Sequence, residues 1–496
     1  MKLYLNSEIR IPKSKILLAT LFLMSSWTSA SEAWHRVEQT GELRWGADAT
    51  GGEPYIFPDP QNPSQTIGFE VDVMNALARY LKVRPHVIQA PWEQLVPVLL
   101  RGDFDVAFNG LEITPERQYV IDFTQPYYRF AEQITVRKGD QRFHTFMDLR
   151  GHRIGTLSGS LALLMMTDDG HMTPMAYPSP VEIYEDLALG RTDAVLLDIP
   201  IAVWYARPNP ALENVGEPVG NGLYAGGIRK DSPVLREKLN DAIHALQQSG
   251  ELEAIYRKWN LWNEDQRALA AENKKNTSSP FLEKHWASYV PLLLKGAGMT
   301  VIISILSMAL AIFGGWGLCL GKLYGPWLTQ KLCSAFIEVV RGTPLLVQLY
   351  LLYYGLPTIG IQLNAFIAAV LGMGMNYAAY EAEIYRAGLL SISKGQEEAA
   401  RSLGLTHRQS LWHILLPQAF RTILPPSTND FVALFKDTSI VSVITVTELT
   451  RAYNLSSTAS YRFLELGIVT AALYFLMSYP LALWSKQLEK KRHAIH

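Results

Sequence analysis

The stretch Glu398-Ala399-Ala400-Arg401-Ser402-Leu403-Gly404, followed nine residues later by Ile414-Leu415-Leu416-Pro417, decides how this chain folds. It is a polar insert that lies between hydrophobic segments. Its alanines allow close backbone approach, and Gly404 can end one short helix in the left-handed conformation. The apolar residues before Pro417 suit a second helix that buries one face. Because two short helices at an angle form a knob for a groove, the insert predicts a docking site for a soluble partner.

Length and composition indicate a chain of two unlike halves. It has 496 residues, of which 48% are hydrophobic, and a mean hydropathy of +0.05, as expected when a soluble half is averaged with a membrane half. A formal net charge of −1 gives no sign of nucleic-acid binding. The two cysteines, Cys319 and Cys333, lie in or beside predicted membrane segments, so a disulfide-stapled exported fold is not expected.

The N-terminal segment is typical of an export signal. Basic residues between Lys2 and Lys15 precede the apolar run 16–24, and small residues follow at 28–33. We therefore predict a signal peptide in residues 1–33, with an uncleaved N-terminal anchor as the alternative. Either interpretation places the next segment outside the cytoplasm.

Residues 34–262 form the predicted exported domain. Short apolar segments that suit strands, such as 43–47, 106–108, 154–156 and 194–197, alternate with helix-like segments such as 71–81 and 95–100. This alternation predicts an α/β domain with mixed sheets. Residues 263–288 contain a polar stretch without apolar periodicity, which predicts a linker or a helix that runs into one.

Residues 289–490 form a predicted all-α domain of about five transmembrane helices. The expected spans are 296–320, 332–355, 363–383, 423–446 and 466–484. The fourth contains Lys436 and Asp437 and is too polar to face lipid, so it must face protein or a water-filled path. These two residues are candidates for lining the translocation path, and a structural ion pair between helices is the alternative.

Basic residues set the expected orientation. If the exported domain places the start of the first span outside, the insert and the basic C-terminal segment 490–492 lie in the cytoplasm, where positive charge gathers. Arg451 and Arg462 fall outside and are exceptions to this pattern.

The insert resembles the EAA loop of ABC importer permeases, and the flanking segments 341–348 and 434–439 agree with that family. The resemblance implies a type I permease fold, a separate cytoplasmic ATP-binding subunit, and either a homodimer or a second permease subunit. The residues that it assigns to docking of the ATPase are Glu398, Ala399, Ala400, Gly404 and Pro417. No phosphate-binding loop occurs, since the spacing from Gly317 to Lys322 is wrong, so we expect a transport subunit that is not an enzyme and holds no cofactor or metal.

The exported half resembles the type II, bilobal periplasmic binding proteins for polar amino acids, of the glutamine and histidine permease systems. The fragments that carry this resemblance, in order, are Gly68-Phe69-Glu70-Val71-Asp72, Trp92-Glu93-Gln94-Leu95-Val96-Pro97, Gly102-Asp103-Phe104-Asp105, Ile113-Thr114-Pro115-Glu116-Arg117, Asp122-Phe123-Thr124-Gln125-Pro126-Tyr127-Tyr128, Gly190-Arg191-Thr192-Asp193-Ala194 and Lys258-Trp259.

An amino acid brings a carboxylate and an ammonium into a closing cleft, and each needs a partner there. By the resemblance, Arg117 is the carboxylate clamp and Asp198 the counter-ion of the ammonium. Trp92 aligns with an aromatic residue that covers the ligand, and Ser160 lies in the turn Ser158-Gly159-Ser160, which offers N–H groups and a hydroxyl. Asp48 and Gly110 align with further pocket positions. The alternatives are a surface ion pair for Arg117, core packing for Trp92 and a helix cap for Ser160.

Two departures from the family pattern leave the identity of the ligand open. Glu112 stands where family members commonly have Ser or Thr; it would hold an ammonium or a basic side chain, or pair with Arg117. Gly51-Gly52 replaces a bulky pocket residue.

Together these observations predict the fused substrate-binding and permease subunit of an ABC importer for polar amino acids, a multi-pass protein of the cell inner membrane. The alternatives are a ligand-gated channel or a chemosensory receptor with an amino-acid-binding ectodomain. A channel of that kind has its pore inserted within the binding domain, whereas here the spans follow the whole domain.

Overall fold

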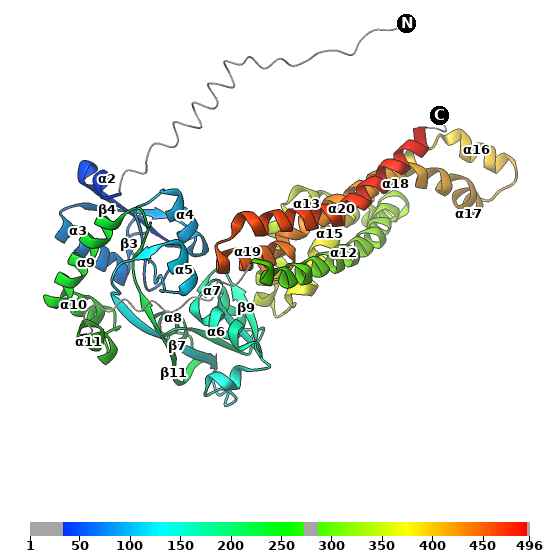
Figure 1. Cartoon of the computed structure of the whole chain (residues 1–496). Helices are drawn as coiled ribbons and strands as arrows, with labels where there is room; N and C mark the ends of the chain where they lie inside the picture. The colour runs from blue at the N-terminus through cyan, green and yellow to red at the C-terminus, as the bar shows by residue number, and fades with distance from the viewer. Residues whose placement is uncertain (1–32, 272–285, 494–496) are drawn as a thin grey trace, which may run out of the picture.

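The computed structural model describes residues 33–271 and 286–493. An α/β domain occupies one end of the described chain and a helical domain the other (Figure 1). The predicted signal peptide, apart from its last residue, lies outside the described residues, and so does most of the predicted linker.

The first lobe of the α/β domain is built on a five-stranded sheet of order β4-β1-β5-β12-β6. In it β1 runs parallel to β4 and β5, whereas β12 is antiparallel to β5 and β6. The strands are β1 (Glu42–Ala47), β4 (Arg84–Gln89), β5 (Val106–Ala107), β6 (Asp122–Phe123) and β12 (Gly227–Ile228), and a hairpin of β2 (Phe57–Pro58) and β3 (Thr66–Ile67) lies beside them. The helices are α2 (Ala33–Thr40), α3 (Phe69–Leu81), α4 (Leu95–Arg101), α5 (Pro115–Val120), α9 (Pro233–Gln248) and α10 (Glu251–Lys258), with a 3₁₀ turn η1 (Trp92–Gln94).

The second lobe has a sheet of order β11-β7-β10-β8-β9. Its strands are β7 (Tyr128–Arg137), β8 (Arg153–Leu157), β9 (Thr173–Tyr177), β10 (Ala194–Asp198) and β11 (Leu212–Tyr224). Its helices are α6 (Leu161–Asp169), α7 (Pro180–Ala188) and α8 (Ile199–Ala206), with a 3₁₀ turn η2 (Phe146–Leu149). The chain enters this lobe between β6 and β7 and leaves it between β11 and β12. Two sheets that each mix parallel and antiparallel strands confirm the predicted bilobal α/β fold.

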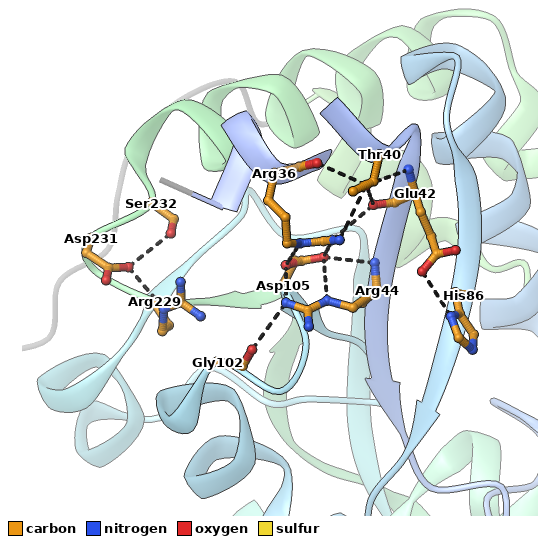
Figure 2. A network of polar contacts seen from close by, with 10 residues as sticks. All are labelled: Arg36, Thr40, Glu42, Arg44, His86, Gly102, Asp105, Arg229, Asp231 and Ser232. Carbon is orange, nitrogen blue, oxygen red and sulfur yellow. Dashed lines mark hydrogen bonds and ion pairs between the residues drawn. The ribbon is translucent and has the colours of Figure 1, made fainter. Parts of the chain in front are cut away.

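Asp105 ties the start of the first lobe together. Its carboxylate is 1% exposed and accepts hydrogen bonds from the Arg36 guanidinium, from Arg44 Nη2 at 3.0 Å and from the Arg44 backbone N–H at 2.9 Å. Figure 2 shows both guanidinium groups against this carboxylate. A buried carboxylate needs such partners, and here they join α2 to β1 and to the loop before β5.

The polar segment after Trp262 begins with a helix, α11 (Glu264–Ala271), that packs on the second lobe. The Gln266 side chain accepts from the backbone N–H of Arg129 at 2.9 Å and donates to the carbonyl of the same residue at 2.6 Å. These bonds hold α11 against β7.

The helical domain contains two helices long and apolar enough to cross a membrane among its described residues, Ala287–Tyr324 and Phe463–Ser485, or three if the bent pair Trp327–Gly342 and Leu345–Ile359 is one span. Its elements are η3 (Trp286–Tyr289), α12 (Val290–Tyr324), α13 (Trp327–Gly342), α14 (Leu345–Tyr350), η4 (Leu351–Gly355), η5 (Leu356–Ile359), α15 (Ala365–Leu390), α16 (Lys394–Ser402), α17 (His407–Ser410), η6 (Leu411–Leu415), α18 (Leu416–Asp437), η7 (Thr438–Ile444), α19 (Leu449–Ser460) and α20 (Phe463–His493).

The structure corrects the second predicted span, 332–355. It is broken by a bend of 108° between α13 and α14. Pro344 lacks an N–H and forces the preceding residue out of the helical region, and Thr343 has φ −117° and ψ 141°. The Gln348 side chain then donates to the Val340 carbonyl at 2.7 Å, which satisfies a group that the break leaves free.

The fourth predicted span, 423–446, is also not one continuous α-helix. Helix α18 ends at Asp437, a 3₁₀ segment follows to Ile444, and Thr445 adopts a positive φ of 64°. The polar residues near Asp437 therefore lie where the α-helix ends and the chain changes direction.

We expect Asp105→Ala to destabilise the first lobe by about 3 kcal/mol, because it leaves two partly buried guanidinium groups without their common acceptor. The measurement is amide hydrogen exchange of β1 and β5 in the detergent-solubilised chain. Asp103→Ala is the matched control, since Asp103 pairs with Arg101 on the surface, and its effect should stay under about 1 kcal/mol. Equal exchange in both variants would contradict the role of Asp105.

Candidate functional site

A cavity of about 30 Å³ lies between the two lobes. Most of the predicted ligand residues line this cavity. Its lining also includes Tyr55, Asn109 and Leu157, which were not predicted from the sequence. The predicted residues that line it are Asp48, Trp92, Gly110, Glu112, Ser160 and Asp198. Arg117 is not part of the lining but contacts Glu112, which is. The fold therefore brings the predicted residues together from both lobes.

Arg117 is held at the start of α5, where Thr114 caps the helix and accepts from the Arg117 backbone N–H at 3.3 Å. Its side chain is buried, so a surface ion pair is excluded. Nη1 donates to the Glu112 carboxylate at 3.1 Å and to the Glu112 carbonyl at 2.9 Å, and Nη2 donates to the Gly159 carbonyl at 2.9 Å. The guanidinium also lies 5.1 Å from the centre of the Trp92 ring.

Glu112 occupies an anion position at the first turn of α6. Besides Arg117, its carboxylate accepts from the Leu161 backbone N–H, at 2.9 Å to the nearer oxygen. Burial raises the pKa of Glu112, although the Arg117 charge and the Leu161 N–H act in the opposite direction. Because Arg117 and Glu112 belong to the first lobe and Gly159 and Leu161 to the second, these contacts hold the lobes closed.

Asp198 lies where β10 ends and α8 begins. Its carboxylate accepts from the Tyr55 hydroxyl at 2.5 Å and from the Tyr224 hydroxyl. The Tyr224 ring is fixed by stacking on Phe130, with ring centres 4.3 Å apart. Burial, followed by the Glu112 charge, raises the pKa of Asp198 to about 7. Neither tyrosine was predicted, because only the fold brings them to Asp198.

Two further carboxylates stand beside the cavity and were missed by the sequence analysis. Glu132 lies opposite Asp198 in the β7–β10 register, and within the described residues neither of its carboxylate oxygens has a hydrogen-bond partner. Burial, with the Asp198 and Glu112 charges, raises its pKa well above the usual range. Glu70 accepts from the Gly110 N–H at 2.7 Å and from the Tyr127 hydroxyl at 2.5 Å, and burial raises its pKa to about 7.

Asp48, Trp92 and Ser160 each make bonds that shape the cavity wall. Asp48 accepts from the backbone N–H groups of Thr50 at 2.9 Å and Trp92 at 2.8 Å. The Trp92 ring donates to the Asn109 carbonyl at 3.0 Å. Ser160 caps α6 by accepting from the Leu163 N–H at 3.2 Å, so it does form the helix cap that was one interpretation of this turn.

Gly51-Gly52 is explained by backbone crowding. A Cβ on Gly52 would lie 2.0 Å from the Asp48 carbonyl oxygen, and Gly51 has φ +74°. No side chain fits at Gly52 without moving the loop, which excludes a bulky pocket residue at this position.

The docking insert forms two short helices, α16 and α17, at the end of the helical domain that faces away from the α/β domain (Figure 1). Between them Gly404 has φ +87°, which confirms the left-handed helix end. Ala400 is buried, whereas Leu403 and Trp412 are 83% and 62% exposed. Glu398, Ala399 and Pro417 are also exposed. The insert thus presents large apolar side chains that nothing in the described chain covers.

Lys436 and Asp437 do not form an ion pair with each other within the described residues. Lys436 is exposed, and Asp437 accepts from the Tyr377 hydroxyl on α15 at 2.7 Å.

The two halves match two known families. Residues 43–261 match the bacterial extracellular solute-binding proteins, family 3, and residues 313–493 match the binding-protein-dependent transport system inner membrane component. A match of 313–493 to a transport component favours neither a ligand-gated channel nor a chemosensory receptor.

Known relatives agree with these matches. The glutamine transport system permease protein GlnP of Escherichia coli strain K12 is 37% identical over 41% of this chain and 93% of its own length. The arginine transport system permease protein ArtQ of Bacillus subtilis strain 168 is 36% identical over 41% of this chain and 93% of its own length. Among solved structures, an ancestral arginine-binding protein bound to arginine is 31% identical, with a TM-score of 0.42 over 44% of this chain and 98% of that one.

The chain belongs to the amino-acid ABC transporter permease family, and it is an inner-membrane, multi-pass importer subunit in which a family 3 solute-binding domain is fused to the permease.

Proposed function

We propose that this chain captures an amino acid with a cationic side chain, such as L-arginine, and passes it to its own permease domain. The observation that carries this proposal is the charge around the cavity. Asp48, Glu112 and Asp198 line it, and Glu132 is buried beside Asp198. Arg117, a cation beside the cavity, is already paired with Glu112.

A ligand with two positive groups and one carboxylate would offset the negative charge of the carboxylates around the cavity. Arg117 receives the carboxylate, Asp198 receives the ammonium, and Glu112 becomes free to hold the cationic side chain. Buried carboxylates without cations are costly, as the raised pKa values of Asp198 and Glu132 indicate. A neutral ligand such as glutamine leaves that cost in place.

The names of the relatives do not choose between these ligands. The similar permeases include one named for glutamine and another named for arginine, both at nearly the same identity. The permease passes on what the binding domain selects, so the cavity residues determine the ligand.

We further propose that a separate ATP-binding subunit docks on α16 and α17 and supplies ATP hydrolysis from the cytoplasmic side, while the binding domain lies in the periplasm. The exposed Leu403 and Trp412 support a partner there, because a groove that buries them gains about 2 kcal/mol for each. The placement of the insert and the binding domain at opposite ends supports this orientation (Figure 1). A second permease, the same or related, completes the path.

Calorimetry of the detergent-solubilised full chain should show that L-arginine binds more tightly than L-glutamine, and that binding of L-arginine weakens as pH falls. Asp198 has a pKa of about 7, and a bound cation favours its charged form. Affinity is therefore fully present above pH 7 and falls by up to about tenfold per unit below it. Asp198→Asn should remove this slope, and tighter binding of L-glutamine would contradict a cationic ligand.

Arg117→Ala should weaken the binding of every amino acid in the same calorimetric panel by on the order of 100-fold, because the ligand carboxylate loses charge-assisted hydrogen bonds. Arg150→Ala is the control, since Arg150 pairs with Asp169 on the surface. Unchanged affinity in Arg117→Ala would mean that another group holds the carboxylate.

Gly404→Ala should reduce ATP-driven uptake into proteoliposomes that contain the partner ATPase, while the binding of L-arginine stays unchanged. A side chain at φ +87° is strained, although nothing lies within 4 Å of the added Cβ. Gly395→Ala is the control, because Gly395 lies inside α16 in ordinary helical conformation, where alanine is favoured. Equal uptake by both variants would count against docking at this turn.

A further inference from the structure

Helix α19 of the permease lies against the α/β domain (Figure 1), and it meets both lobes beside the cavity. Arg451, near the start of this helix, and Tyr461, directly after its end, contact the α/β domain. Both lie at least 250 residues from the cavity residues in the sequence, so no local pattern relates them to the site.

Arg451 spans the two lobes. Its Nη2 donates to the Ser158 hydroxyl at 2.6 Å and to the Ala176 carbonyl at 2.8 Å, both in the second lobe. Its Nη1 lies 3.7 Å from the Glu93 carboxylate in the first lobe. The side chain is buried, and Glu448 anchors its backbone N–H at 2.7 Å. One guanidinium can reach all three groups only when the lobes are closed.

A second contact joins the second lobe to the permease. The Arg191 guanidinium lies 3.8 Å from the centre of the Tyr353 ring, and the Tyr353 hydroxyl donates to Asp186 at 2.8 Å. Asp186 in turn pairs with Arg191 at 2.8 Å. These contacts set the position of the second lobe on the permease independently of α19.

Tyr461 reaches the clamp itself. Its hydroxyl accepts from Arg117 Nε at 3.2 Å. Tyr461 has φ +57°, a left-handed conformation that is unusual for a bulky residue and persists only where the surroundings hold it. Tyr461, like Trp92, packs against the apolar cluster of the first lobe that contains Leu95 and Leu99. The permease therefore supplies a group to the immediate surroundings of Arg117.

With Tyr461 in place, each nitrogen of the Arg117 guanidinium has an acceptor from the chain. Nε donates to Tyr461, Nη1 to Glu112 and Nη2 to Gly159. A ligand carboxylate must displace some of these acceptors, so every added acceptor competes with it. Reciprocal linkage requires that a bound carboxylate weakens the contact to Tyr461 to the same extent.

We propose that Tyr461 is a positioning residue that lowers the affinity of the docked binding domain for the ligand carboxylate. Arg451 holds the closed lobes against the permease, so that the Tyr461 hydroxyl stays within reach of Arg117. This inference rests on the proposed role of Arg117 as the carboxylate clamp. Docking on the permease thus releases the amino acid at the membrane surface by competing for Arg117.

The test is the affinity of the full chain in nanodiscs for L-arginine, measured by calorimetry for Tyr461→Phe and wild type. The variant keeps the ring and loses only the hydroxyl. We expect about fivefold tighter binding, the change that corresponds to one hydrogen bond. In proteoliposomes with the ATPase, both KM and the maximal rate of uptake should fall, because release becomes slower. Arg451→Gln, which loosens docking, should also bind L-arginine more tightly.

Tyr453→Phe is the matched control. Tyr453 lies on the same helix, but its hydroxyl donates to the Phe463 carbonyl, away from Arg117. It should behave as wild type in both assays. Unchanged or weaker binding in Tyr461→Phe would overturn the inference, as would the same change in Tyr453→Phe.

Failure of the proposed function has a different signature. A wild-type chain that does not bind L-arginine contradicts the cationic ligand, and the comparison of variants is then made with L-glutamine, which carries the same α-carboxylate. A chain that binds neither amino acid overturns both proposals.

Discussion

A buried guanidinium needs an acceptor for each of its nitrogens, and the arrangement of this protein around Arg117 follows from that constraint. The acceptors come from three places: Glu112 in the first lobe, Gly159 in the second and Tyr461 in the permease. Satisfying one side chain therefore closes the cleft and also connects it to the membrane domain. Any group that enters the cavity and takes a donor from Arg117 changes both relationships.

The second constraint is negative charge. Glu112, Glu132 and Asp198 are buried within one neighbourhood; the Glu112 charge raises the pKa of Asp198, and the charges of Asp198 and Glu112 raise the pKa of Glu132. Tyrosine hydroxyls reduce the cost for Asp198, but Glu132 has no such partner among the described residues. This negative charge is the basis for proposing a ligand that carries positive charge, with binding that depends on pH within the neutral range.

Local patterns in the sequence predicted much of the fold. The alternation along 43–108 predicted β1, α3, α4 and β5 nearly at their observed positions, and Gly404 ends a helix in the expected left-handed conformation. The second membrane span was wrong because mean hydropathy does not register a single backbone break, although Thr343-Pro344 was visible in the sequence. The fourth span was predicted as continuous for a similar reason, since polarity alone does not locate the end of a helix.

The site residues also fall into two groups, those that the sequence predicted and those that only the fold reveals. The resemblance pointed to residues that the fold brings to one cavity, and pairing of Glu112 with Arg117 was among the alternatives considered. Tyr55, Tyr224 and Tyr461 could not be found, because their roles arise only when segments 26 to 344 residues apart meet. Arg451 did leave a signal: it was an exception to the charge pattern of the loops, and the structure buries it against the binding domain.

Since the capture module and the passage are parts of one polypeptide, the cell makes them one for one. A separately encoded receptor can be produced in excess and can scavenge ahead of transport, whereas here uptake capacity scales with the membrane area given to this protein.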